Sequence, residues 1–76
     1  MTPEQIQQLI ATGMPGARVE VSGGDGKFVA NVTSDEFEGL TPIKRHKLVY
    51  ACVNDEIASG ALHALTIVAK TPAEIA

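Results

Sequence analysis

The chain has few aromatic residues, a single cysteine and no long apolar run, and each scarcity excludes a class of protein. Only Phe28, Phe37 and Tyr50 among its 76 residues carry aromatic rings, so its core has to be built from Val, Ile, Leu and Ala. The lone Cys52 excludes an internal disulfide and fits a reducing compartment. No apolar stretch approaches the roughly 20 residues that a membrane-spanning helix needs.

Positive charge is also scarce. Six Lys and Arg against nine Asp and Glu give a formal net charge of −3. This balance argues against a protein whose main task is to grip nucleic acid, because phosphate-driven affinity needs several cations on one face. The first residues are polar and acidic, unlike a signal or transit peptide. We therefore expect one cytoplasmic domain over residues 1–76, with one small core and no membrane partner.

The first half of the chain predicts a helix followed by a β-hairpin. Thr2 and Pro3 are typical of a helix start, and apolar residues follow at helical spacing until Gly13. Two runs of alternating apolar and polar residues then flank a Gly-rich segment, which predicts an antiparallel hairpin with one buried face. We expect the helix over residues 3–12, the strands over 17–22 and 27–33, and the turn over 23–26.

The second half predicts a longer helix and a third strand. Gly39 stops the preceding segment, Thr41 suits a helix cap and Pro42 suits the first helical position. A later run of apolar and β-branched residues suits an inner or well-covered strand. We expect a helical turn over 35–40, the main helix over 42–57, the strand over 62–69 and a frayed turn from Thr71. The apolar stripe of the main helix comprises Ile43, Val49, Tyr50, Val53 and Ile57, and His46 lies within it.

This order of elements predicts an α+β domain. One three-stranded mixed sheet with its helices packed on one face buries the apolar residues that the chain offers. We do not expect an enzyme, because no nucleophile has a base beside it and no pair of carboxylates has an apolar setting. Cys52 fits a small, half-buried core residue without a catalytic role. An exposed strand edge would allow weak self-association of a chain that is mainly monomeric.

Four basic side chains crowd the start of the main helix, where the helix dipole disfavours positive charge. They are Lys44, Arg45, His46 and Lys47. This placement indicates either a nearby acid, for which Asp35, Glu36 and Glu38 are candidates, or an anionic partner. A solvated face, an acidic protein surface and weakly held nucleic acid phosphates remain alternatives. His46 either packs against the sheet with a backbone partner or lies near a partner surface.

Several spaced motifs extend over nearly the whole chain. They are Pro15-Gly16-Ala17, the Gly-rich hairpin, Phe37-Glu38-Gly39-Leu40, Lys44-Arg45-His46, Val49-Tyr50, His63-Ala64-Leu65 and Thr71-Pro72. Together they resemble the BolA family, and within it the short, acid-stress-associated IbaG/YrbA-like branch. The resemblance implies an αββαβ(α) domain of the class II KH-like type.

The resemblance also implies a partner and a cofactor. BolA-like proteins work with monothiol glutaredoxins in iron–sulfur cluster handling, and a [2Fe–2S] cluster is shared between the two proteins. The family's first ligand falls on His63, although on residues alone an imidazole at a strand entrance is more often partly buried and hydrogen-bonded. The family's second ligand position falls on or next to Lys27, and a protonated lysine has no lone pair for iron. Asp25 could reach the same space, but a carboxylate is an unusual cluster ligand.

Some BolA-like proteins are described as transcriptional regulators. The resemblance therefore implies an alternative in which a helix-turn-helix-like region around Lys44–Lys47 contacts DNA. The charge balance favours the protein partner, and the helix layout favours DNA.

Overall fold

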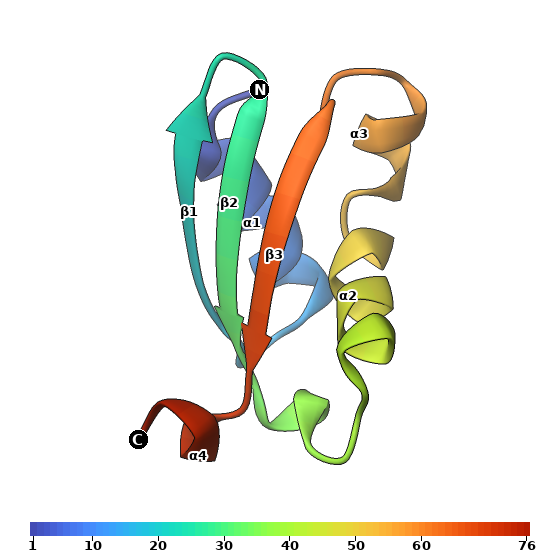
Figure 1. Ribbon diagram of the computed structural model, residues 1–76. Helices are drawn as coiled ribbons and strands as arrows, with labels where there is room; N and C mark the ends of the chain where they lie inside the picture. Colours follow the sequence, from blue (N-terminus) through green and yellow to red (C-terminus); the bar gives the residue numbers. More distant parts are fainter.

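The computed structural model describes all residues, Met1 to Ala76. Three strands and four α-helices form a sheet layer and a helix layer (Figure 1). The elements are α1 Pro3–Gly13, β1 Arg18–Gly24, β2 Lys27–Thr33, a 3₁₀ turn Asp35–Phe37, α2 Pro42–Ala51, α3 Asn54–Ala58, β3 Ala64–Lys70 and α4 Pro72–Ile75. None of the helices has the length and apolar character that a bilayer crossing requires.

The sheet has the mixed topology that the sequence predicts. β2 lies in the centre, antiparallel to β1 and parallel to β3. Along β2, Phe28, Ala30 and Val32 are buried whereas Lys27 and Val29 are exposed, so one face of the sheet carries the helices and the other is open. Of the two alternatives expected for the last strand, inner or well covered, the inner position is wrong, because β3 is an edge strand. The central place belongs to β2, because it is the strand that pairs on both sides.

The hairpin is tighter than predicted. β1 continues to Gly24, which pairs with Lys27, so the turn is only Asp25 and Gly26. Both residues have positive φ, 53° and 79°. Two successive positive φ angles define the type I′ turn, whose twist matches that of the flanking strands. Asp-Gly is a preferred pair for this turn, which explains why the loop shortens.

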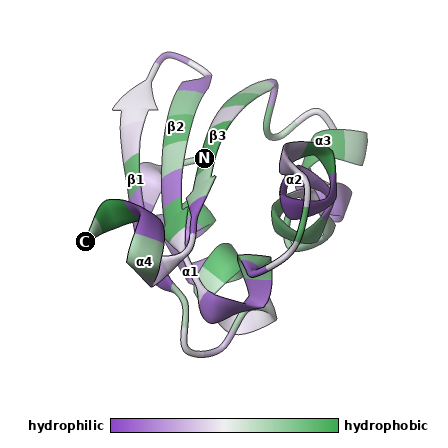
Figure 2. Ribbon diagram, turned by 60° about the horizontal axis from the view of Figure 1, so that its bottom comes forward, coloured by the Kyte–Doolittle hydropathy of each residue, from purple (hydrophilic) through white to green (hydrophobic).

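The core lies between the sheet and the helices. Ile6 and Ile10 of α1, Phe37 of the 3₁₀ turn and Val49 of α2 are fully buried against the sheet. In Figure 2 long hydrophobic stretches follow β2 and β3, whereas hydrophilic and hydrophobic bands alternate along α2. The helix starts follow local rules: Thr2 and Gln5 form a capping box, and Thr71 and Glu74 form another.

The prediction of one helix over 42–57 is wrong, because the helix breaks at Cys52 and Val53. The N–H groups of these residues bond three residues back, to Val49 and Tyr50, and Val53 leaves the helical region with φ −127°. Val53 is fully buried. Burying a valine is worth about 1.5–3 kcal/mol, more than the helical hydrogen bond that the break disturbs, at about 0.5–1.5 kcal/mol.

The break also divides the predicted apolar stripe. Val49 and Val53 are buried, whereas Ile43 at one end of the stripe is 69 % exposed and Ile57 at the other is 40 % exposed. Only the middle of the stripe therefore faces the core.

Candidate functional site

His63 lies on the exposed segment that leads into β3. The next residue, Ala64, pairs with Lys27 and donates its N–H to the carbonyl oxygen of Gly26 at 3.3 Å. Because β2 and β3 are parallel, their starts lie at the same end of the sheet, beside the hairpin turn (Figure 1, top). The fold thus places His63 next to Asp25 of the turn and Lys27 at the start of β2, although 36 residues or more separate them in sequence.

The His63 ring is open to a partner. The side chain is exposed, and none of the side-chain hydrogen bonds within the chain involves it. The partly buried, hydrogen-bonded histidine expected from the residues alone is therefore not what the fold contains. An exposed neutral imidazole has a lone pair that can bind a metal.

The chain does not assemble a metal site of its own. No group of three or more His, Cys, Asp or Glu side chains is arranged to hold a metal ion. Near His63 the turn offers Asp25, whose carboxylate is a hard ligand. Lys27, at the start of β2, has no lone pair to donate when it is protonated. Around His63 the chain therefore offers a single imidazole donor and no second soft ligand.

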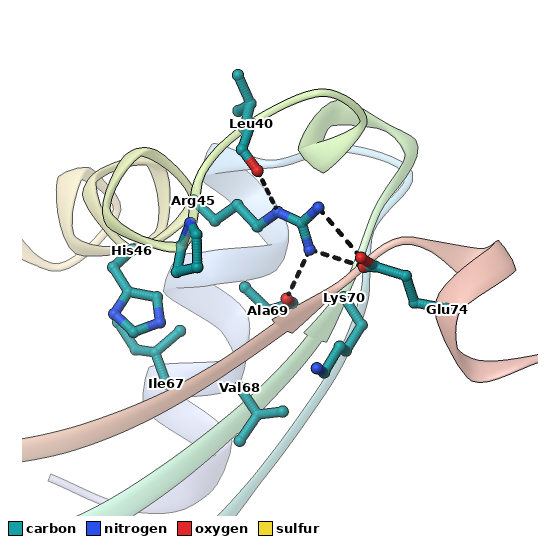
Figure 3. A pocket seen from close by; sticks show the side chains of 9 residues that line it. Leu40, Arg45, His46, Ile67, Val68, Ala69, Lys70 and Glu74 are labelled. Carbon is teal, nitrogen blue, oxygen red and sulfur yellow. Dashed lines mark hydrogen bonds and ion pairs between the residues drawn. The ribbon is translucent and has the colours of Figure 1, made fainter.

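The basic helix start lies at the other end of β3, and its central residue is engaged within the chain. Arg45 donates from Nε to the carbonyl oxygen of Leu40 at 2.9 Å and from Nη1 to that of Ala69 at 3.2 Å. Its two Nη atoms also form a fork with Glu74, at 2.7 and 3.3 Å (Figure 3). The Arg45 side chain is only 13 % exposed. Its guanidinium ties the start of α2 to the end of β3 and to α4.

Glu74, which the sequence analysis did not single out, is the acid that pairs with the basic cluster. The hydrogen bond from Arg45, followed by that from the Thr71 N–H, lowers the pKa of Glu74 to about 2. The Asp35, Glu36 and Glu38 side chains, the acids expected from sequence, form no ion pair with the cluster. The sequence shows the capping pattern of Thr71 and Glu74. It does not show that Glu74 meets Arg45, which lies 29 positions earlier.

The other basic residues are free of such bonds. Lys44 and Lys47 are exposed, and His46 is half-buried and faces Ile67 of β3 (Figure 3). Arg45, His46, Lys70 and Glu74 line a shallow cavity of about 360 Å³ between α2 and the end of β3. Its charges are mixed, because the carboxylate of Glu74 already accepts from Arg45. The backbone partner expected for the His46 ring is not found among the side-chain hydrogen bonds.

The α2–α3 pair lacks a basic recognition helix. A helix-turn-helix protein reads DNA with its second helix, which lies in the major groove. Here the second helix, α3, has five residues, carries Asp55 and Glu56 and contains no Lys or Arg. The free cations are on α2, so contact with DNA through this region would be with phosphates rather than with bases.

Cys52 is half-buried against the core, as the sequence predicts. Burial, reinforced by the negative charge of Glu36, raises the pKa of its thiol. A thiol is nucleophilic as the thiolate, so this environment disfavours catalysis.

The sequence pattern of the family described as BolA-like protein matches residues 11–74, and most of the chain lies within that match. The chain belongs to the BolA-like family. The fold agrees, since this BolA-like chain superposes on a BolA protein homologue from Coxiella burnetii with a TM-score of 0.89 and 37 % identity. That alignment covers 99 % of this chain and 96 % of the homologue.

Two relatives place the chain near the branch that the sequence resembles. An uncharacterized protein of the rpoN–murA intergenic region of Acinetobacter guillouiae is 43 % identical over 74 residues, which are 97 % of this chain and 89 % of that protein. The acid stress protein IbaG of Escherichia coli K12 is 32 % identical over 74 residues, 97 % of this chain and 88 % of IbaG. The BolA-like chain is thus similar to IbaG over nearly its whole length.

Proposed function

We propose that this BolA-like protein is a non-enzymatic interaction module that docks on a monothiol glutaredoxin in the cytoplasm. In the complex, the His63 imidazole contributes one ligand to a [2Fe–2S] cluster whose other ligands come mainly from the partner. The observation that carries the proposal is the exposed His63 ring, free of internal hydrogen bonds, in a chain without a metal-binding group of its own.

The position of His63 supports a shared site. The ring lies at a corner of the molecule, where the starts of two parallel strands meet the hairpin turn. A partner approaching this corner meets an imidazole without displacing any bond of the fold. Iron–sulfur clusters take imidazole as well as thiolate ligands, so the residue type is suitable.

The test compares the two histidines of the chain. Cluster-loaded monothiol glutaredoxin is mixed with the wild-type chain, and visible absorbance and circular dichroism are recorded. We expect a spectral change that His63→Ala abolishes and His46→Ala preserves, because His46 lies beside Ile67, well along β3 from the corner. An unchanged wild-type spectrum, or the same change with His63→Ala, would contradict the cluster role. Calorimetry with iron-free glutaredoxin measures docking separately.

Lys27 provides a second, independent probe. Replacing it by histidine restores an imidazole at the position where the family resemblance places the second ligand. Because Lys27 is exposed and pairs with Ala64, next to His63, the substitution should be tolerated by the fold. We expect Lys27→His to slow cluster loss from the complex, and Lys27→Gln, which removes only the charge, to leave the loss rate near that of wild type.

A further inference from the structure

The sheet has two edges, and at one of them side chains of α2 donate hydrogen bonds to the outer backbone carbonyls. The Tyr50 hydroxyl donates to the carbonyl oxygen of Leu65 at 3.3 Å, and Arg45 donates to that of Ala69 at 3.2 Å. Both carbonyls belong to β3, and α2 lies beside the C-terminal part of that strand (Figure 1). Because these two carbonyl groups already have partners, they cannot also pair with another strand, and the β3 edge is partly blocked.

No side chain forms a hydrogen bond with the backbone of the β1 edge. β1 pairs with β2 at every residue from Arg18 to Gly24 without a bulge, and no element lies beyond it in the sheet. Apart from the ladder with β2, no backbone hydrogen bond reaches residues 18–24. The strand also lacks proline and lysine, two residues with which proteins blunt exposed edges. Its outer backbone groups are therefore available to an added strand.

The charges on β1 indicate which strand can pair with this edge. Arg18 and Glu20 point to the open face of the sheet, 3.2 Å apart, with 76 % and 68 % of their side chains exposed. A two-fold dimer pairs identical strands antiparallel. An axis through Val19 sets Arg18 of each copy opposite Glu20 of the other, so four charges of alternating sign form a square. An axis through Glu20 would instead oppose two like charges, which is destabilising.

We propose that β1 pairs with β1 of a second copy about a two-fold axis through Val19, giving a weak dimer with one six-stranded sheet. The pairing covers residues 17–21 and keeps the two cores on the same side, because Val19 of both copies faces the helix layer. So short a contact, held partly by exposed ion pairs, is salt-sensitive and leaves the chain monomeric when dilute. β3 and His63 lie at the opposite edge, so this inference stands apart from the cluster proposal.

The first test measures self-association by sedimentation velocity between about 10 µM and about 1 mM at low ionic strength, where mass action reveals a weak dimer. We expect Glu20→Lys to weaken the dimer about tenfold, because two cations then face each other twice, and Arg18→Glu combined with Glu20→Lys to restore it. Glu38→Lys, with the same charge change away from the edge, should have no effect. Thermal unfolding followed by circular dichroism confirms that each variant folds.

The second test traps the register. Chains with Arg18→Cys and chains with Glu20→Cys, both lacking the native thiol through Cys52→Ala, are mixed and oxidised. The mixed disulfide should predominate over both homodimeric disulfides, because facing residues bring their Cβ atoms within reach of a disulfide. Four results would each overturn the proposal. They are a monomer at every concentration, a dimer whose affinity does not change with Glu20→Lys, a double swap that does not restore the dimer, and a predominance of homodimeric disulfides. The proposal would also be overturned if the β1 edge bound glutaredoxin and not a second copy of the chain.

Discussion

Gly23 allows the last residues of β1 to approach β2 closely. Its φ is +121°, a conformation that residues with side chains rarely adopt. A Cβ atom placed there would overlap with the carbonyl oxygen of Lys27 and lie 2.9 Å from the Cα of Phe28. Both obstacles are backbone atoms, which cannot rotate away. Gly24, the next residue, has open space around it and no positive φ.

We therefore expect Gly23→Ala to lower the free energy of unfolding by on the order of 2–4 kcal/mol, as backbone strain and steric overlap add. Gly24→Ala, the matched control, should change it by no more than about 0.5 kcal/mol. Urea unfolding followed by circular dichroism measures both values. Equal losses at the two positions would contradict the steric argument.

At the scale of elements, α1 meets the break between α2 and α3 through one close contact. A Cβ atom on Gly13, the last residue of α1, would lie 2.5 Å from Sγ of Cys52. Gly13→Ala should thus destabilise the protein by about 1 kcal/mol, although alanine is the better helix former. In a Cys52→Ala background the same substitution should cost less, with a coupling of about 1–2 kcal/mol in a double-mutant cycle of urea unfolding. Strictly additive effects would show that overlap with Sγ of Cys52 is not the cause of the destabilisation by Gly13→Ala.

The ion pair of Arg45 and Glu74 joins α2 to α4 and makes stability depend on pH. The pKa of Glu74 is lowered from 4.5 to about 2 in the folded chain. The ionised carboxylate therefore stabilises the fold fully above pH 4.5, and the contribution is lost as the pH falls through 2. We expect Glu74→Gln to lower the melting temperature at pH 7 and the difference from wild type to shrink between pH 4.5 and 2. A difference that is constant over this range would argue against the ion pair.

At the scale of the whole molecule, the two candidate surfaces lie at opposite ends of β3. Six residue steps along the chain lead from His63 to Ala69, which Arg45 contacts, and in a strand they correspond to roughly 20 Å. Sites this far apart act independently unless a two-state element connects them. The two functions that the sequence leaves open, cluster binding and nucleic acid binding, can therefore be separated by substitution.

We expect His63→Ala to abolish the spectral change with cluster-loaded glutaredoxin while leaving any binding of labelled duplex DNA unaltered. Lys44→Ala together with Lys47→Ala should do the reverse and reduce the slope of log affinity against log salt by up to about 2, because two phosphate contacts are lost. Fluorescence anisotropy at several salt concentrations measures the DNA binding. If either variant impairs both activities equally, the two ends are not independent.

Much of the local structure could be read from the sequence because its causes are local. The capping boxes of Thr2 and Thr71, the hairpin and the bounds of β2 follow from hydrogen bonds and alternation among residues a few positions apart. The α+β fold followed as well, since the order of elements leaves few ways to bury their apolar faces. The family followed from the spaced motifs that resemble it. The importance of His63 came from the resemblance and not from local pattern, and its ligand role stays a prediction.

The tertiary structure decided the features that depend on distant residues. The helix break at Val53 arises because the core takes up that side chain, and the edge position of β3 arises because β2 pairs with both other strands. Arg45 looked from sequence like one cation in a basic cluster, yet packing places Glu74 beside it and takes it out of solvent. Periodicity reports which face of an element is apolar. Which partner meets that face is set by long-range packing, which no local window of sequence contains.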